Sequence, residues 1–318
     1  MKTKVGVVMD PLESVKPKKD STLAIMQAAQ KKGWDLFEIQ QNGIFFTKNQ
    51  VFGNCRKVSL HFDQATHFSV LSSKTIPLEE MDIVLFRKDP PFNMEYIYTT
   101  YLLDVLEKRG VPVLNKPSSI RNCNEKLFAL EFSDCCPEYL VSNDQEVLRD
   151  FYDEYQDVVF KPLDGMGGSS IFRVSPNDKN LGVIIETLTQ HGKCQTMAQK
   201  YLPEIQQGDK RILIINGEPI PYALARIPAK NENRGNLAAG GSGVGKTLTK
   251  RDQFICDSVR EALVSRGLYF VGIDVIGDYL TEINVTCPTC IRELDQAFGL
   301  DIGGKYIEFI AREILGND

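Results

Sequence analysis

Residues 158–174, VVFKPLDGMGGSSIFRV, contain two predicted strands, residues 158–162 and 171–174, joined by a glycine-rich turn. Because glycine lets the backbone approach closely, successive amide groups of such a turn can surround a phosphate. Lys161, near the end of the first strand, would add a positive charge for the same phosphate. A tight turn beside a solvated lysine is the alternative, and these residues alone do not decide between the two.

A second pair of predicted strands, residues 270–276 and 279–285, carries three oxygen-bearing side chains. Asp274 interrupts the apolar run of the first strand, while Glu282 and Asn284 share one face of the second because strand side chains alternate. If the strands pair, the three side chains converge, and hard oxygen ligands of this kind suit Mg²⁺. The sequence therefore predicts a magnesium site, with a half-exposed polar hairpin face as the alternative.

Four arginines stand at strand ends or in loops that flank these two regions: Arg87, Arg211, Arg226 and Arg234. The planar guanidinium group suits carboxylates and transferring phosphoryl groups. A surface salt bridge is the usual alternative for any single arginine. Spacing along the chain does not show whether the four share one site.

The first 120 residues alternate strands and helices. We predict strands at 5–9, 36–39, 83–86 and 111–114, and helices from Ser21, as the N-cap, to Gly33 and from Met94 to Arg109. This alternation predicts an α/β layer with a largely parallel sheet. Polar residues at the carboxyl ends of its strands, Asp10, Arg87 and Asn115, would then face the ligand crevice.

The rest of the chain is typical of an antiparallel α+β arrangement. We predict helices at 181–190 and from Thr249, as the cap, to Gly267, a strand at 196–202, and hairpins at 211–227 and 270–285. Residues 228–248 are polar and rich in glycine, and a loop of this length is usually functional or disordered.

Residues 240–247, GGSGVGKT, match the P-loop pattern of nucleotide-binding proteins in full. A working P-loop follows a buried strand and opens a helix directly. The residues before this match are polar, and the match lies outside the parallel half of the chain. We therefore interpret it as part of a mobile lid, with a P-loop NTPase switch as the competing hypothesis.

Composition limits the classes of function. The 318 residues are 42% hydrophobic and 25% charged, as in a globular protein of two or three domains, and a net charge of −5 gives no general attraction to nucleic acid. The sequence has no signal-peptide pattern and no apolar run near the ~20 residues of a membrane span. We expect a cytoplasmic protein that binds neither nucleic acid nor membrane. The pair Cys287 and Cys290 has metal or redox spacing, but no second ligand pair accompanies it.

Six runs of the sequence together resemble the bacterial glutathione synthetase family. They occur in the order of that family and span nearly the whole chain: RKDPPF (87–92), NCNEKL (122–127), KPLDGMGG (161–168), LARIP (224–228), RGNLAAGG (234–241) and TEINV (281–285). The chain departs from the family pattern at Cys287, where a serine is more usual, and in the tail of the lid.

The resemblance implies an ATP-grasp fold preceded by a parallel α/β domain. The expected divisions are an N-terminal substrate domain at 1–121, a central subdomain at 122–202 with the lysines and the small glycine loop, and a C-terminal subdomain at 203–318. The last would carry the metal site and a lid at 227–245.

The resemblance also implies roles for individual residues. ATP would be bound by Lys126, Lys161, Gly165, Met166, Gly167, Gly168, Ser169, Gln199, Tyr201 and Leu202, the last three beside adenine. Asp274, Glu282 and Asn284 would hold the metal. The substrate would be bound by Arg87, Arg226 and Arg234, while Arg211 and Arg226 would stabilise the reacting groups.

The activity implied by the resemblance is ATP-dependent ligation of γ-glutamylcysteine to glycine through an acyl phosphate. The expected cofactor is Mg²⁺, with Mn²⁺ as a substitute, and ATP is a co-substrate. A homo-oligomer, specifically a tetramer, is also implied. Two alternatives remain at this stage, an ATP-grasp ligase that joins a different acid and amine, and a nucleotide-binding module without catalysis.

Overall fold

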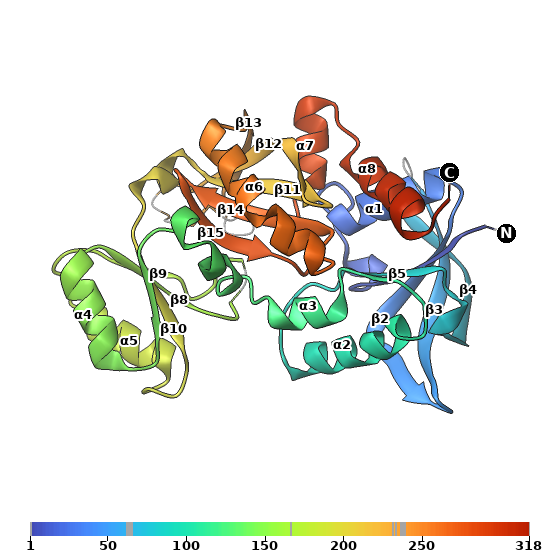
Figure 1. Cartoon of the computed structure of the whole chain (residues 1–318), viewed down its shortest axis with the longest axis horizontal. Helices are drawn as coiled ribbons and strands as arrows, with labels where there is room; N and C mark the ends of the chain where they lie inside the picture. The colour runs from blue at the N-terminus through green and yellow to red at the C-terminus, as the bar shows by residue number, and fades with distance from the viewer. Residues whose placement is uncertain are drawn as a thin grey trace.

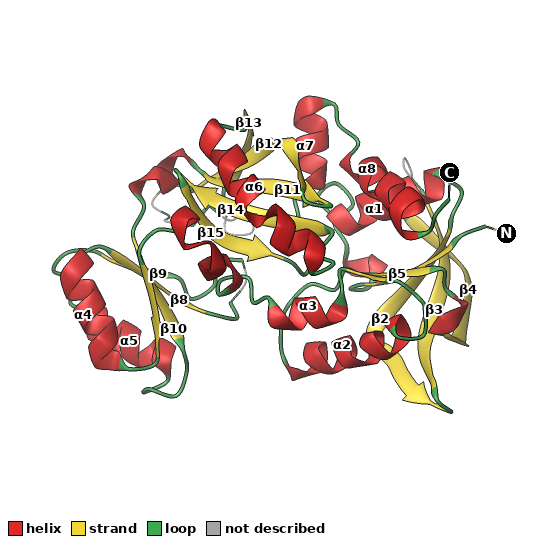
Figure 2. Cartoon of the chain, in the orientation of Figure 1, coloured by secondary structure: helices red, strands yellow, loops and turns green. Residues whose placement is uncertain are grey.

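Three β-sheets follow one another along the chain in the computed structural model (Figure 1). The structure describes residues 2–61, 66–165, 167–230, 232, 234–235 and 240–317. Helices lie on both faces of the first sheet and on the outer faces of the second and third sheets (Figure 2).

The first sheet has six strands in the order β4-β3-β2-β1-β5-β6. Their bounds are Lys4–Val8 (β1), Asp35–Thr47 (β2), Gln50–Leu60 (β3), Phe68–Pro77 (β4), Ile83–Phe86 (β5) and Val113–Leu114 (β6). The strands β2, β1, β5 and β6 are parallel, which confirms the predicted parallel layer. The antiparallel strands β3 and β4 were not predicted, because β4 is mostly exposed and β3 carries charged side chains.

Helices cover both faces of this sheet: α1 (Ser21–Lys31), α2 (Met94–Glu107) and α3 (Pro117–Asn122). The prediction that Ser21 caps α1 was wrong, because Asp20 is the N-cap and its carboxylate accepts a hydrogen bond from the Leu23 amide (2.5 Å). The Ser21 hydroxyl instead accepts a hydrogen bond from the Ile291 amide (3.2 Å) and so ties α1 to the C-terminal region.

The second sheet has four antiparallel strands in the order β7-β10-β8-β9. They are Tyr139–Ser142 (β7), Val158–Pro162 (β8), Phe172–Val174 (β9) and Thr196–Lys200 (β10). Helices α4 (Gln145–Tyr155) and α5 (Leu181–Thr189) pack together on one face, away from the rest of the molecule (Figure 2). The other face is therefore free to form a wall of a site.

The third sheet has five antiparallel strands in the order β13-β12-β11-β14-β15. They are Asp209–Ile215 (β11), Glu218–Ile227 (β12), Ser242–Thr247 (β13), Phe270–Ile276 (β14) and Tyr279–Asn284 (β15). Both predicted hairpins are present, and Asp274 stands opposite Glu282 across β14 and β15. Helices α6 (Lys250–Ser265), α7 (Ile291–Phe298) and α8 (Ile302–Phe309) complete the region, and Thr249 caps α6 as predicted.

The segment that matches a P-loop is mostly strand. Residues 242–247 form β13, which pairs antiparallel with β12, and the Lys246 ammonium donates to the Gln207 carbonyl (3.0 Å). The predicted loop at 228–248 is therefore shorter than expected, because its last third belongs to the sheet. Six residues of the expected lid, 231, 233 and 236–239, lie outside the described residues.

One hydrophobic core joins the two ends of the chain. It contains Val5 of β1, Leu23 of α1, Phe270 of β14 and Ile307 of α8, all nearly inaccessible to solvent. Figure 1 shows α1 and α8 side by side. Short helical turns complete the fold: 3-10 helices at Leu12–Ser14, Leu78–Glu80, Phe128–Cys135 and Pro203–Gln207, and a π-helix at Ile310–Ile314. None of the helices in the described part of the chain has both the length and the apolar character that crossing a bilayer requires.

Candidate active site

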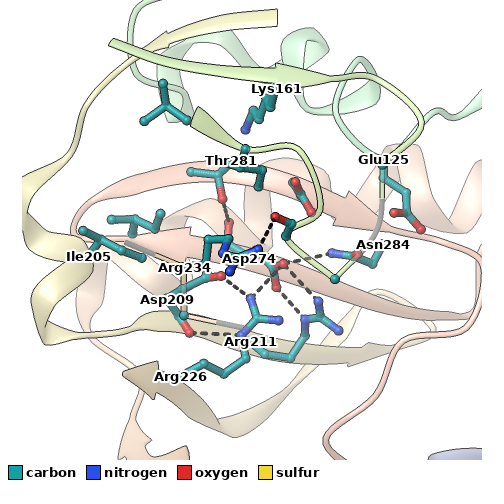
Figure 3. A pocket seen from close by; sticks show the side chains of 18 of the residues that line it. Glu125, Lys161, Ile205, Asp209, Arg211, Arg226, Arg234, Asp274, Thr281 and Asn284 are labelled. Atoms are coloured by element: carbon teal, nitrogen blue, oxygen red, sulfur yellow. Dashed lines mark hydrogen bonds and ion pairs between the residues drawn. The ribbon is translucent and has the colours of Figure 1, made fainter. Parts of the chain in front are cut away.

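A cavity of about 330 Å³ lies between the second and third sheets. Its walls come from β8 and β10 on one side and from β11, β12, β14 and β15 on the other. In Figure 3, Lys161 projects from one wall toward the hairpin that carries Asp274 on the other. A volume of this order is typical of small-molecule sites.

Two buried lysines approach the cavity from different elements. Lys161 on β8 is 5% exposed, and its ammonium donates to the Gln199 side-chain oxygen (3.0 Å). Burial lowers the pKa of Lys161 below its usual value. Lys126, which precedes the helical turn at 128–135, donates to the Gly165 carbonyl (3.1 Å) and lies 3.5 Å from the Glu282 carboxylate. Lys161 has no ion pair among the described residues, and the contact of Lys126 with Glu282 is longer than a hydrogen bond of normal length, so both cations can bind an anionic ligand.

The glycine loop has the backbone conformation that its composition predicts. Gly167 and Gly168 have φ of +62° and +80°, values that side chains with a Cβ rarely adopt. The Arg234 guanidinium donates to the Gly168 carbonyl (3.1 Å) and pairs with Glu232 (2.6 Å). Arg234 thus links the segment after β12 to the glycine loop. Met166, predicted to bind ATP, lies outside the described residues.

A buried network of charged side chains forms the floor of the cavity (Figure 3). Arg211 donates to both oxygens of Asp274, through Nε (2.5 Å) and Nη2 (2.9 Å), and Arg226 Nη2 lies 2.8 Å from Oδ2 of the same carboxylate. Arg226 also pairs with Asp209, its partner across β11 and β12. The Asn284 amide donates to Asp274 Oδ2 (3.2 Å).

The network explains the acidity of its two carboxylates. Burial alone would raise the pKa of Asp274, but Arg211 and Arg226 hold it below its usual range. Asp209 differs, because burial and the charge of Asp274 raise its pKa in spite of Arg226. Asp209 Oδ1 is buried and has no hydrogen-bond partner among the described residues.

The sequence did not single out Asp209 or Glu125, although both line the cavity. Glu125 accepts a hydrogen bond from the Thr286 hydroxyl (2.9 Å), and burial, together with the nearby Glu282, raises its pKa. Asp209 begins β11 two residues before Arg211, so the alternation of strand side chains could have placed both on the face of the cavity. Glu125 had no such signal, because it lies outside any strand.

Three predicted site residues, Arg87, Lys126 and Ser169, do not line this cavity, and Arg87 is held away from it by contacts of its own. It is 4% exposed, and its guanidinium donates to the Thr22 hydroxyl (3.2 Å) and to the Pro288 carbonyl (2.9 Å). Both contacts position the loop at 287–290 against α1. Cys287 and Cys290 of that loop line the cavity wall, and burial raises the pKa of both thiols.

Apolar and aromatic side chains line another part of the cavity. Gln199, Tyr201 and Leu202, predicted to be near adenine, are joined there by Val159 and Ile205. The Arg173 guanidinium lies 3.5 Å from the centre of the Tyr201 ring and so fixes its orientation. Figure 3 shows Ile205 on the opposite side of the cavity from Glu125. The cavity therefore combines a mainly apolar region with a strongly charged one.

The arrangement of sheets around this cavity is found in solved ligases. The D-cycloserine synthetase DcsG superposes with a TM-score of 0.67 at 13% sequence identity, with 98% of this chain and 99% of that chain covered. At this identity the likeness concerns the fold. The fold and the family of its ATP-grasp domain define this chain as an ATP-grasp ligase.

Sequence comparison identifies the particular family. The family model of the prokaryotic glutathione synthetase N-terminal domain matches residues 3–121, and that of the prokaryotic glutathione synthetase ATP-grasp domain matches residues 125–299. Glutathione synthetases of Pseudomonas aeruginosa and Pseudomonas putida are 53% and 52% identical over 314 residues, which cover 99% of this chain and 99% of each relative. The chain belongs to the prokaryotic glutathione synthetase family, which confirms the predicted resemblance.

Proposed function

We propose that this chain joins γ-glutamylcysteine to glycine at the cavity between the second and third sheets, with conversion of ATP to ADP and phosphate. One observation carries the proposal. Lys161 and the glycine loop, which Lys126 contacts through the Gly165 carbonyl, face two arginines and an acidic hairpin across the cavity. The first wall suits phosphates and the second suits a carboxylate that has to be activated.

ATP would lie with adenine beside Tyr201 and Leu202 and with its phosphates toward Lys126, Lys161 and the loop at 165–169. Three features of the chain support this orientation. The apolar lining suits a base, the two cations suit the phosphates, and the positive φ of Gly167 and Gly168 lets the backbone approach closely.

A divalent cation would be held by Asp274, Glu282 and Asn284. Asp274 and Glu282 are cross-strand partners, and the Asn284 amide nitrogen donates to Asp274, which leaves the amide oxygen available to the cavity. No group of three His, Cys, Asp or Glu side chains converges within the described residues, so the amide is needed as the third ligand. Mg²⁺, or Mn²⁺ in its place, would offset the charge of the phosphates when bound there.

The first chemical step is attack by a carboxylate oxygen of γ-glutamylcysteine on the γ-phosphorus of ATP. The bond to the bridging oxygen breaks, ADP leaves, and an acyl phosphate forms. Lys161 and Lys126 stabilise the negative charge on the transferring group. Arg226 and Arg234 orient the acid.

The amine of glycine then attacks the acyl carbon. The tetrahedral oxyanion that forms needs donors aimed at it, and Arg211 and Arg226 are buried cations on the cavity floor. Phosphate leaves with the oxygen that attacked ATP. Arg234, through its bond to Gly168, would hold the lid segment against the glycine loop and keep water from the acyl phosphate.

An isotope experiment tests this route. γ-Glutamylcysteine labelled with ¹⁸O in the cysteinyl carboxylate is incubated with ATP and glycine, and the phosphate is analysed by mass spectrometry. The route places one ¹⁸O in each phosphate released. Label that remains wholly in the peptide or in water would contradict the acyl phosphate.

A cytoplasmic homo-oligomer, a tetramer by family resemblance, also belongs to the proposal. All eight cysteines are free thiols, as expected in a reducing compartment that supplies ATP. Met94, Tyr98 and Tyr101 form an exposed apolar stripe on α2, each about half accessible, which suits contact with a second copy. Light scattering on the purified protein tests this: a monomer at micromolar concentration would contradict it.

A further inference from the structure

The carboxylate of Asp274 stands where two parts of the proposed mechanism meet. It belongs to the candidate cation site, and it also holds Arg226, which would orient the acid, and Arg211, which would stabilise the oxyanion. Its Oδ2 accepts from Arg211, Arg226 and Asn284, and its Oδ1 accepts from Arg211. A carboxylate offers about four lone-pair positions. Three of the four contacts fall on Oδ2, which has two lone pairs, so a cation that binds Asp274 through Oδ2 displaces one of its donors.

Of the two arginines, Arg226 leaves Asp274 at the lower cost. Arg211 grips Asp274 through two nitrogens, whereas Arg226 uses one. Arg226 also keeps its ion pair with Asp209 and its bond from Nε to the Asp209 backbone carbonyl (3.3 Å). Asp209 would therefore hold the Arg226 guanidinium in place after its contact with Asp274 breaks. The N–H group that had contacted Asp274 would then be available to the acid.

We propose that Asp274 exchanges partners: it binds Arg211 and Arg226 in the absence of a divalent cation and releases Arg226 to the acid substrate when the cation binds. The exchange rests on the proposed function and adds an order of binding to it. Nucleotide and cation enter first, and the carboxylate of γ-glutamylcysteine follows. Asp209 acts as a positioning residue for Arg226.

Linkage makes the exchange measurable. If the cation strengthens binding of the acid by a given factor, the acid strengthens binding of the cation by the same factor. Coupling between two sites is typically about 5- to 150-fold, so we expect the acid to bind at least about tenfold more tightly with the cation than without it.

Calorimetric titration tests the exchange without turnover. γ-Glutamylcysteine is titrated into the full chain with the β,γ-imido analogue of ATP, once with excess Mg²⁺ and once with EDTA. The exchange predicts a dissociation constant about tenfold or more lower with Mg²⁺. Equal dissociation constants with Mg²⁺ and with EDTA would contradict the exchange but leave the proposed substrate in place. Absence of binding in both would overturn the proposed substrate, and the exchange with it.

Two variants separate the exchange from simple charge attraction. Asp274→Asn removes the partner of both arginines, so it should bind the acid in EDTA about as tightly as the wild type does with Mg²⁺. Glu282→Gln removes a charge from the facing position of the same hairpin but leaves the arginine contacts intact. It should show no such gain. If both variants bound the acid in EDTA more tightly than the wild type by the same factor, loss of a nearby negative charge would explain the tighter binding. That result would overturn the exchange.

Discussion

At the scale of single residues, the site is built from side chains that are buried but not fully neutralised. Lys161 is the clearest case, because its described hydrogen bond goes to an amide oxygen rather than to a carboxylate. Keeping a cation buried in this way costs stability unless a ligand completes it. We therefore propose that Lys161 serves binding and not folding.

Lys161→Met removes the charge and keeps the volume of the side chain. We expect kcat for ligation to fall at least about 100-fold, the usual effect of losing one preorganised donor to a transition state. The melting temperature should stay the same or rise. Lys200→Ala is the matched control: its ion pair with Glu138 (3.4 Å) is exposed, and its loss should leave kcat within about twofold. Equal effects of both changes on kcat would remove Lys161 from the mechanism.

Gly272 gives Arg211 the space to lie across β14. A Cβ added at this glycine would lie 2.8 Å from Cδ of Arg211 and 2.9 Å from Cβ of Pro288, so the arginine would have to shift. We expect Gly272→Ala to raise KM for γ-glutamylcysteine more than KM for ATP and to cost about 1–3 kcal/mol of stability. Gly182→Ala, where the nearest atom is the flexible end of Arg149 at 3.2 Å, should keep wild-type kinetics. An unchanged KM for the acid in Gly272→Ala would show that the position of Arg211 does not matter.

At the scale of elements, strand pairing decides what the P-loop pattern means. Its lysine lies on β13, where it contacts the Gln207 carbonyl, and not at the start of α6, which begins at Lys250. We expect Lys246→Ala to keep ligation within about twofold and to lower stability by no more than about 1 kcal/mol. Loss of all ATP consumption in this variant would instead support a P-loop NTPase.

The elements that the sequence predicts well are those with a strong local signal. The hairpin at 270–284 has two strands rich in apolar residues on either side of the turn Gly277-Asp278, and α6 has both a capping threonine and a terminal glycine. By contrast, β4 carries exposed polar residues and exists because β3 offers it hydrogen bonds. The strand β4 therefore depends on pairing with another part of the chain, and a local sequence pattern does not reveal such pairing.

In the candidate site too, local patterns could be predicted from the sequence and long-range contacts could not. Asp274, Glu282 and Asn284 could be paired from strand periodicity alone. The burial of Arg87 beneath the loop at 287–290 could not be predicted in this way, because its hydrogen-bond partners are 65 and 201 residues away along the chain. The contact between Arg234 and Gly168 likewise joins segments 66 residues apart.

At the scale of the whole molecule, one buried side chain fastens the first sheet to the third. Asn115, at the end of β6, donates to the carbonyls of Phe270 and Val285 (2.8 Å each) and accepts from the Phe270 amide (2.9 Å). It thus connects the N-terminal layer to both strands of the hairpin that carries Asp274.

Asn115→Ala would leave these buried backbone groups without partners, at a cost of about 2–4 kcal/mol. We expect a melting temperature several degrees lower, measured by calorimetry. Asn143→Ala, which loses one bond to the Gly192 carbonyl at the edge of the second sheet, should lower it by less than half as much. Equal shifts would mean that the junction of the sheets is not a special point of stability.

The central claim is that the cavity between the second and third sheets performs one ligation, and a single assay tests it most directly. ADP release from Mg-ATP is measured with γ-glutamylcysteine and glycine together, with each alone and with neither. Strong release only with both, matched by an equal amount of tripeptide, is the predicted result. Release that does not depend on the acid, or release with both but without tripeptide, would contradict it.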